Sequence, residues 1–241
     1  RGGGGGGARP RQTATMTIVA RTTRDVLTVH GPEAVAWLQG QLSQDVAGLA
    51  VGESSWSYVL APQGKVAGWG RVVRTADDAV QSDVDAGAGA AWVARLERFK
   101  LRTKAEIELR AEVPCVAVRG ARPEASLPAG WPGIDGGDLL DAGDTSVEAA
   151  VAAGAEVVSA EHLDALRIRA GVPSWGAELD DDTIPATVGQ WVIDASVSFT
   201  KGCYTGQELV ARVDSRGGNV PRHLAVVTIA GPAPAPGTEV S

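Results

Sequence analysis

Cysteine, lysine, tyrosine and phenylalanine are scarce in this chain of 241 residues, which holds two Cys, four Lys, two Tyr and two Phe. Two cysteines are too few for a disulfide framework, so the sequence favours the reducing cytoplasm. Long apolar runs are lacking too. The longest stretch without Asp, Glu, Lys or Arg covers 16 residues and three prolines, from His223 to Thr238. A membrane-spanning helix needs about 20 apolar residues, so no contact with a membrane is expected.

Basic residues are fewer than acidic ones, 22 against 29, and the net charge is −7. An acidic body repels the phosphate backbone of nucleic acids. The composition therefore argues against broad binding of nucleic acid, and no direct nucleic-acid partner is expected. A local basic groove is still compatible with these numbers.

Short strands and helices alternate in the sequence without a regular βαβ repeat, and hairpin turns such as Pro62-Gln63-Gly64 join some of the strands. This mixture predicts an α+β fold with a mainly antiparallel sheet. A stretch rich in Gly, Pro and Asp, residues 120–144, predicts a loop. The expected strands cover residues 26–30, 56–60, 65–74, 105–109, 113–118 and 222–229, and the expected helices cover residues 33–42, 89–99, 161–170 and 206–213.

Several of the scarce residues gather in one octapeptide, which reads Lys201-Gly202-Cys203-Tyr204-Thr205-Gly206-Gln207-Glu208. A cysteine acts as a nucleophile or metal ligand only as the thiolate. The charge of Lys201 and the start of the helix expected after Gly206 would both favour that form of Cys203. The two glycines allow unusual backbone angles or a close approach. A small buried cysteine in a turn is the competing interpretation, and a catalytic pair with His223 stays open.

The other reactive side chains give weaker signals. Cys115 lies in an apolar run, which favours core packing. The three histidines are scattered, and no spacing of His and Cys resembles a zinc site. The acidic residues at 178 and 180–182 fit either a hard cation or a solvated loop. Among the seven Trp, one or two could form a stacking wall for a flat heterocycle.

The octapeptide resembles the signature of the YgfZ family of folate-binding, iron–sulfur-related proteins, which share a fold with the T-protein (aminomethyltransferase) of the glycine cleavage system. Further segments are similar to that family in the same order along the chain. They are residues 31–46, 60–66, 96–102, 166–173, 184–185 and 210–212, so the resemblance extends over about residues 26–222.

This resemblance implies a folate-binding module of ferredoxin-like α+β subdomains, followed in the family by a small C-terminal β-barrel. Three parts of the chain are expected on that basis. Residues 1–15 would be a disordered or cloning-derived tail, and residues 16–223 the folate-binding, T-protein-like module. Residues 224–241 would be a linker and the start of a truncated barrel, most of which lies outside the chain.

The resemblance also implies the site. Cys203 is the functional cysteine of the signature, and Lys201 would keep it deprotonated. Tetrahydrofolate or a related folate is the expected cofactor, and no metal ligands are expected. Iron–sulfur enzymes or assembly factors are the expected partners. The other residues of the signature are Gly202, Tyr204, Gly206, Gln207, Glu208 and Arg212, and the candidate pocket residues are Arg102, Arg169 and Trp175.

Two positions depart from the related enzymes. Aminomethyltransferases place a catalytic Asp just after the hairpin turn, where this chain has Ala67-Gly68-Trp69-Gly70 and so lacks a group for acid–base chemistry. Related folate binders commonly carry Glu where this chain has Arg169, which offers only hydrogen-bond donors. The leading hypothesis is thus a YgfZ-like factor for iron–sulfur cluster assembly or repair and, through it, tRNA modification. A folate-dependent one-carbon transferase and a non-catalytic scaffold are the alternatives.

Overall fold

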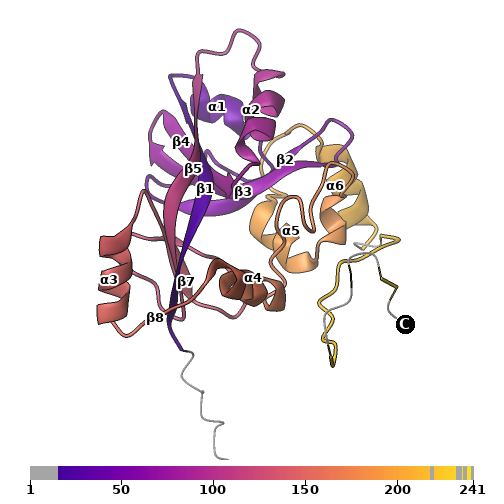
Figure 1. Ribbon diagram of the computed structural model, residues 1–241. Helices are drawn as coiled ribbons and strands as arrows, with labels where there is room; N and C mark the ends of the chain where they lie inside the picture. Colours follow the sequence, from indigo (N-terminus) through magenta and orange to yellow (C-terminus); the bar gives the residue numbers. More distant parts are fainter. Residues whose placement is uncertain (1–15, 218–219, 232–234, 236–237, 240–241) are drawn as a thin grey trace, which may run out of the picture. The chain divides into compact units, whose positions relative to one another are not determined.

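The computed structural model describes residues 16–217, 220–231, 235 and 238–239 (Figure 1). The tail expected at residues 1–15 lies outside the described residues, as does part of the expected linker and barrel start at 224–241. The chain forms two compact units. The smaller unit combines the described residues up to Thr22 with Pro114–Leu163, and the larger unit combines Thr23–Val113 with the described residues from Asp164 onward.

The larger unit is built on an antiparallel sheet. Its strands are β2 (Ser54–Leu60), β3 (Val66–Ala76), β4 (Ala79–Asp85) and the second half of β1 (Ile18–His30), in the order β2-β3-β4-β1. Consecutive strands from β2 to β4 are neighbours because tight turns join them. The sequence predicted β2 and β3 with their hairpin turn, whereas β4 was not expected.

Helices cover both faces of this sheet. On one face, α1 (Ala34–Gln39) and α2 (Gly89–Glu97) bury Leu38 and Trp92 in one apolar cluster with Val72 of β3. Neighbouring strand residues alternate between the faces, so Trp69 of the same strand lies on the opposite face. There its indole N–H donates a hydrogen bond of 2.8 Å to the Ser196 hydroxyl at the end of α5 (Gln190–Ser196).

In the smaller unit, the last part of β5 (Glu106–Arg119) pairs antiparallel with β7 (Gly136–Leu140), which in turn pairs with β6 (Leu127–Pro128). The first residues of β1 pair in parallel with β8 (Glu156–Val157). The helix α3 (Asp144–Ala152) closes the core of this unit. The buried members of that core are Val19, Val116, Val118, Val147 and Ala155.

Three further helices follow: α4 (Ala160–Arg169), the 3-10 turn η1 (Pro185–Thr187) and α6 (Gln207–Ser215). The helices expected at 161–170 and 206–213 are therefore confirmed. In the parts of the chain that the structure describes, none of the helices combines the length and the apolar character needed to cross a membrane.

The α+β class and the mainly antiparallel sheet are confirmed, but some expectations were wrong. The loop predicted at 120–144 contains β6 and β7, because β7 gains its hydrogen bonds from the apolar residues 115–119 of β5. The strands expected at 105–109 and 113–118 are one strand, β5. Residues 222–229 are all described and form no strand. The helices α3 and α5 were not predicted.

Candidate functional site

The signature segment, residues 201–208, joins α5 to α6 in the larger unit. It runs along the loop that follows α1. The Ser198 amide donates to the Ser43 carbonyl at 3.0 Å, and the Thr205 amide donates to the Gly40 carbonyl at 3.0 Å. One of these hydrogen bonds lies just before the segment and the other lies within it, so its conformation is tied to the loop after α1.

The ammonium group of Lys201 also binds the signature segment to the loop after α1. Its Nζ donates three hydrogen bonds to backbone carbonyls, at 2.6 Å to Gln39, 2.7 Å to Leu42 and 2.9 Å to Gln44. An ammonium group has three donors, so all of them are used. Nζ also lies 5.1 Å from the ring centroid of Tyr204, a distance typical of a cation–π contact. Lys201 therefore clamps the start of the signature segment to the loop after α1.

Burial changes the ionisation of both side chains in this clamp. Burial lowers the pKa of Lys201 to about 8, and the nearby Asp45 carboxylate opposes that shift. Burial also raises the pKa of Tyr204 to about 12, so the phenol stays protonated at neutral pH. The Tyr204 amide donates to Oε1 of Gln207 at 3.1 Å, which fixes the turn that leads into α6.

Two glycines let the signature segment meet the β2–β3 hairpin at close range. Gly206 precedes α6 with a φ of 85°, a left-handed conformation. A Cβ atom at this position would lie 2.6 Å from the Ala61 carbonyl oxygen. At the hairpin turn, Gly64 has a φ of 83°, and a Cβ there would lie 2.4 Å from Cβ of Leu209 in α6. Only residues without a side chain allow this contact.

Cys203 itself is exposed between the two fixed ends of the segment, and so is Gly202. The alternative of a buried cysteine in a turn was therefore wrong. Glu208 lies in the first turn of α6 and Arg212 in its last turn, both exposed, where their charges complement the helix dipole. An exposed thiol on a rigidly held turn is open to a partner protein or a small electrophile.

The three candidate pocket residues lie in different surroundings. Arg102 is exposed in the loop after α2, and Arg169 is exposed at the end of α4. Trp175 is half-buried and lines a cavity of about 330 Å³ together with Ala67, Leu179 and two acidic residues, Asp180 and Asp181. Neither arginine lines that cavity.

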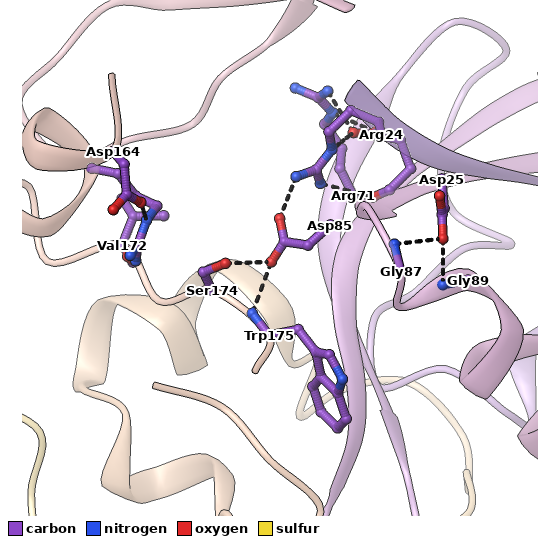
Figure 2. A network of polar contacts seen from close by, with 12 residues as sticks. Arg24, Asp25, Arg71, Asp85, Gly87, Gly89, Asp164, Val172, Ser174 and Trp175 are labelled. Atoms are coloured by element: carbon purple, nitrogen blue, oxygen red, sulfur yellow. Dashed lines mark hydrogen bonds and ion pairs between the residues drawn. The ribbon is translucent and has the colours of Figure 1, made fainter. Parts of the chain in front are cut away.

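A polar network holds Trp175 in place (Figure 2). Oδ2 of Asp85 accepts hydrogen bonds from the Trp175 amide at 2.8 Å and from the Ser174 hydroxyl at 3.0 Å. Its other oxygen accepts from Arg24, which also contacts Asp83 at 3.1 Å. Arg24, Asp83 and Asp85 were not among the site residues expected from the sequence. The alternation of Asp83 and Asp85 in β4 was the available signal, since residues two apart in a strand lie on one face.

A fully buried ion pair, Arg71–Asp83, adjoins this network through the contact between Asp83 and Arg24. Nε and Nη2 of Arg71 each donate to one oxygen of Asp83, both at 2.9 Å, and both side chains are almost inaccessible to water. A neighbouring carboxylate, Asp25, accepts the amides of Gly87 and Gly89 at 2.9 Å and so caps the start of α2 (Figure 2). These charges are structural because each one is paired or capped inside the fold.

Gly68 is one of the four residues that stand where aminomethyltransferases place the catalytic Asp, and it has no room for a side chain. A Cβ at Gly68 would lie 1.8 Å from Nε1 of Trp92, so no side chain fits at that position. Ala67 lines the Trp175 cavity and brings no polar group. Gly68 therefore leaves no room for an acid, and Ala67, Trp69 and Gly70 bring none.

The remaining candidates lie away from the signature segment. Cys115 is buried in the smaller unit, as its apolar run predicted. Trp56 and Trp69 stack with ring centroids 4.1 Å apart, so they form an aromatic stack inside the larger unit. In the described portion of the chain, no three His, Cys, Asp or Glu side chains are grouped so that they could hold a metal ion.

Several known proteins resemble this chain in sequence or in fold. No protein-family model matches the chain. The tRNA-modifying protein YgfZ of Edwardsiella ictaluri is 28% identical over 218 residues, which cover 80% of this chain and 65% of that protein. YgfZ of Klebsiella pneumoniae is 26% identical over 247 residues, which cover 88% of this chain and 72% of that protein. The chain is thus similar in sequence to YgfZ over most of its length. An uncharacterised Haemophilus influenzae protein is 26% identical over 84% of the chain.

The fold of the chain is similar to that of the glycine cleavage T-protein. The aminomethyltransferase of Bartonella henselae superimposes with a TM-score of 0.66 at 19% identity, covering 85% of this chain and 64% of that one. The chain thus spans about two thirds of the length of the Edwardsiella YgfZ and of the Bartonella enzyme. The family resemblance and the T-protein-like α+β fold expected from the sequence are confirmed.

Proposed function

We propose that this chain acts in tRNA modification by supporting the assembly or repair of iron–sulfur clusters in the enzymes that thiolate tRNA. Its similarity to proteins described as tRNA-modifying protein YgfZ supports the link to tRNA. The octapeptide around Cys203 supports a thiol-based role. Iron–sulfur enzymes or their assembly factors are the proposed partners.

The observation that carries this proposal is the exposed Cys203 on a segment fastened at both ends. Lys201 clamps the segment on one side, and Gly206 packs against the hairpin on the other. A thiolate held in a fixed position can serve as a transient ligand or as a nucleophile for a docked partner. All three donors of Lys201 Nζ are used on backbone carbonyls, so we assign Lys201 the role of positioning the turn that carries Cys203.

We propose a reduced folate as the small-molecule ligand, with the Trp175 cavity as its site. The indole ring offers a flat apolar wall, and carboxylates such as Asp180 and Asp181 can accept hydrogen bonds from the donor edge of a pterin. A hydrogen bond from Thr183 lowers the pKa of Asp180, which keeps it an acceptor. A bound folate would supply one-carbon chemistry. Calorimetry with tetrahydrofolate tests this ligand, and Trp175→Ala should abolish the binding heat.

Complementation tests the role of Cys203. The chain and its Cys203→Ser variant are expressed in a bacterial strain that lacks its own YgfZ, and thiolated tRNA nucleosides and iron–sulfur enzyme activities are measured. The unaltered chain should restore both, and Cys203→Ser should restore neither. Cys115→Ala, which removes the buried thiol, is the matched control and should rescue as the unaltered chain does. Full rescue by Cys203→Ser would contradict the proposal.

The residues after the hairpin, Ala67-Gly68-Trp69-Gly70, bring no carboxylate, and this disfavours the transferase alternative. An assay with an aminomethyl donor and tetrahydrofolate should give no product above the uncatalysed rate. Turnover would show that another acid, such as Asp181 beside Ala67, performs the acid–base step. A scaffold without a ligand would give no binding heat with tetrahydrofolate.

A further inference from the structure

The loop after α2 concentrates positive charge in an otherwise acidic chain. Residues 95–104 contain five cations and one acid, Glu97, whereas the whole chain has a net charge of −7. The helix ends at Glu97, and the following residues form turns up to the start of β5. We call residues 98–104 the basic loop. The cations of the stretch are Arg95, Arg98, Lys100, Arg102 and Lys104.

Most of this charge has no carboxylate partner. Among the described residues, Lys100 alone of the five forms an ion pair, at 3.0 Å to Glu97. Arg95 donates instead to the Leu60 carbonyl at 2.8 Å and to Oε1 of Gln41 at 3.2 Å, and it stacks 4.1 Å from the Phe99 ring. Burial, and then the nearby charge of Arg98, lower the pKa of Arg95. A second carboxylate, Glu33, accepts the Lys104 amide at 2.8 Å, so the cations of the stretch outnumber the two acids beside them, Glu33 and Glu97.

The tip of the basic loop is apolar and its backbone is strained. Leu101 is 83% exposed, more than any other large apolar side chain that the structure describes. The next residue, Arg102, has a φ of 57°, a left-handed conformation that is unfavourable for a residue with a side chain. Strained turns and exposed apolar groups are both commoner at binding surfaces than elsewhere. The tip thus offers one apolar group surrounded by cations.

We propose that the basic loop is an RNA-contacting surface. Arg98, Arg102 and Lys104 would bind phosphates, and Leu101 would pack against a ribose or an unstacked base. Arginine presents a planar fork that matches the geometry of a phosphate group, and unpaired bases in RNA loops are the usual targets of apolar and planar side chains. Because the rest of the chain is acidic, only a few phosphates are contacted. The expected Kd is about 1–100 µM at physiological salt, as for non-specific binding.

The basic loop and the signature segment start from the same part of the fold. Arg95, at the base of the loop, contacts Leu60 and Gln41. The signature segment contacts the same places, since a Cβ at Gly206 would meet Leu60 and the Thr205 amide donates to Gly40. RNA on the basic loop would therefore lie on the part of the larger unit that carries Cys203. The RNA contact goes beyond the proposed function and does not depend on the thiol.

Fluorescence anisotropy with a labelled, unmodified tRNA transcript tests the proposal between 50 and 200 mM KCl. The variant Arg98→Gln/Arg102→Gln/Lys104→Gln should bind at least about tenfold more weakly at 50 mM salt and lose about two units of the log–log salt slope. A control variant, Arg122→Gln/Arg216→Gln/Arg222→Gln, removes the same charge from other exposed positions and should change Kd less than about twofold. Leu101→Ser should weaken binding about threefold without a change in slope.

Several results would overturn the proposal. They are no binding of tRNA by the unaltered chain at 50 mM salt, equal weakening in the two triple variants, or an unchanged salt slope in the loop variant. Competition by poly-L-glutamate as strong as that by tRNA would assign the loop to an acidic polypeptide instead. Circular dichroism confirms that each variant folds. Cys203→Ser should bind tRNA with unaltered affinity, so a failure of the Cys203 proposal and a failure of the RNA contact give different results.

Discussion

Lys201 shows how a single residue can hold a reactive neighbour in place. Its ammonium group replaces water at three carbonyl oxygens, and a neutral side chain of similar length could not satisfy them. The side chain ties the turn that carries Cys203 to the loop after α1. Its contribution to function is therefore first a matter of geometry.

Replacement of Lys201 by Met should lower the free energy of unfolding by about 2–3 kcal/mol, because three carbonyls lose their donors. Urea unfolding followed by circular dichroism measures the loss. Lys65→Met removes an exposed lysine paired with Asp182 and should leave the midpoint nearly unchanged. An equal loss in both variants would contradict the clamp.

The clamp should also respond to pH. Folding lowers the pKa of Lys201 from 10.5 to about 8. Between these values the unfolded state binds more protons than the folded state, so the stability contributed by Lys201 rises with pH. The difference in unfolding free energy between the unaltered chain and Lys201→Met should grow by about 1 kcal/mol from pH 7.5 to 10, after allowance for solvent screening. A difference that shrinks over this range would contradict the burial of the ammonium group.

Sequence reasoning reached the identity of these residues but not their contacts. The apolar run around Cys115 predicted its burial, and the octapeptide marked Cys203. The carbonyls that hold Lys201 lie 157 to 162 residues earlier in the chain. No local pattern encodes a contact at that separation, since it depends on how the fold brings the loop after α1 beside the segment before α6.

At the scale of elements, the β2–β3 hairpin and α6 meet through Gly64 and Gly206. The sequence predicted both the hairpin and a helix from 206, because turn residues and helical spacing are local signals. It did not predict that the two elements touch. Nor did it predict β7, whose glycines are typical of a loop and which becomes a strand only through pairing with β5.

The two glycines of the signature provide a matched pair of substitutions. Gly206→Ala should lower the free energy of unfolding by about 2–4 kcal/mol, since φ is 85° and the new Cβ would lie 2.6 Å from the Ala61 carbonyl oxygen. Gly202→Ala should be nearly neutral, because nothing lies within 4 Å of a Cβ there. Thermal unfolding of both variants checks this contrast. Equal melting temperatures would show that Gly206 does not lie in close contact with the hairpin.

At the scale of the whole chain, the α+β class and the antiparallel sheet follow from the mixture of hairpins and helices. The division into two units does not, because β1 and β5 are each continuous strands that contribute residues to both. The buried pair Arg71–Asp83 was also beyond prediction. Charged residues in a strand usually mark a solvated face, whereas here the same face of β3 carries Trp69, which bonds to Ser196 at the end of α5.

The accessibility of the two cysteines to a thiol reagent measures whether the whole chain is folded. In the folded chain Cys203 is exposed and Cys115 is 2% exposed in the core of the smaller unit, so a thiol reagent such as Ellman's should titrate one thiol rapidly. In concentrated urea it should titrate two, and the second should appear with the loss of helical circular dichroism. Cys203→Ser should titrate none when folded and one when unfolded. Two rapid thiols in the folded chain would mean that the smaller unit opens on its own, because Cys115 is reachable only when β5 separates from β7.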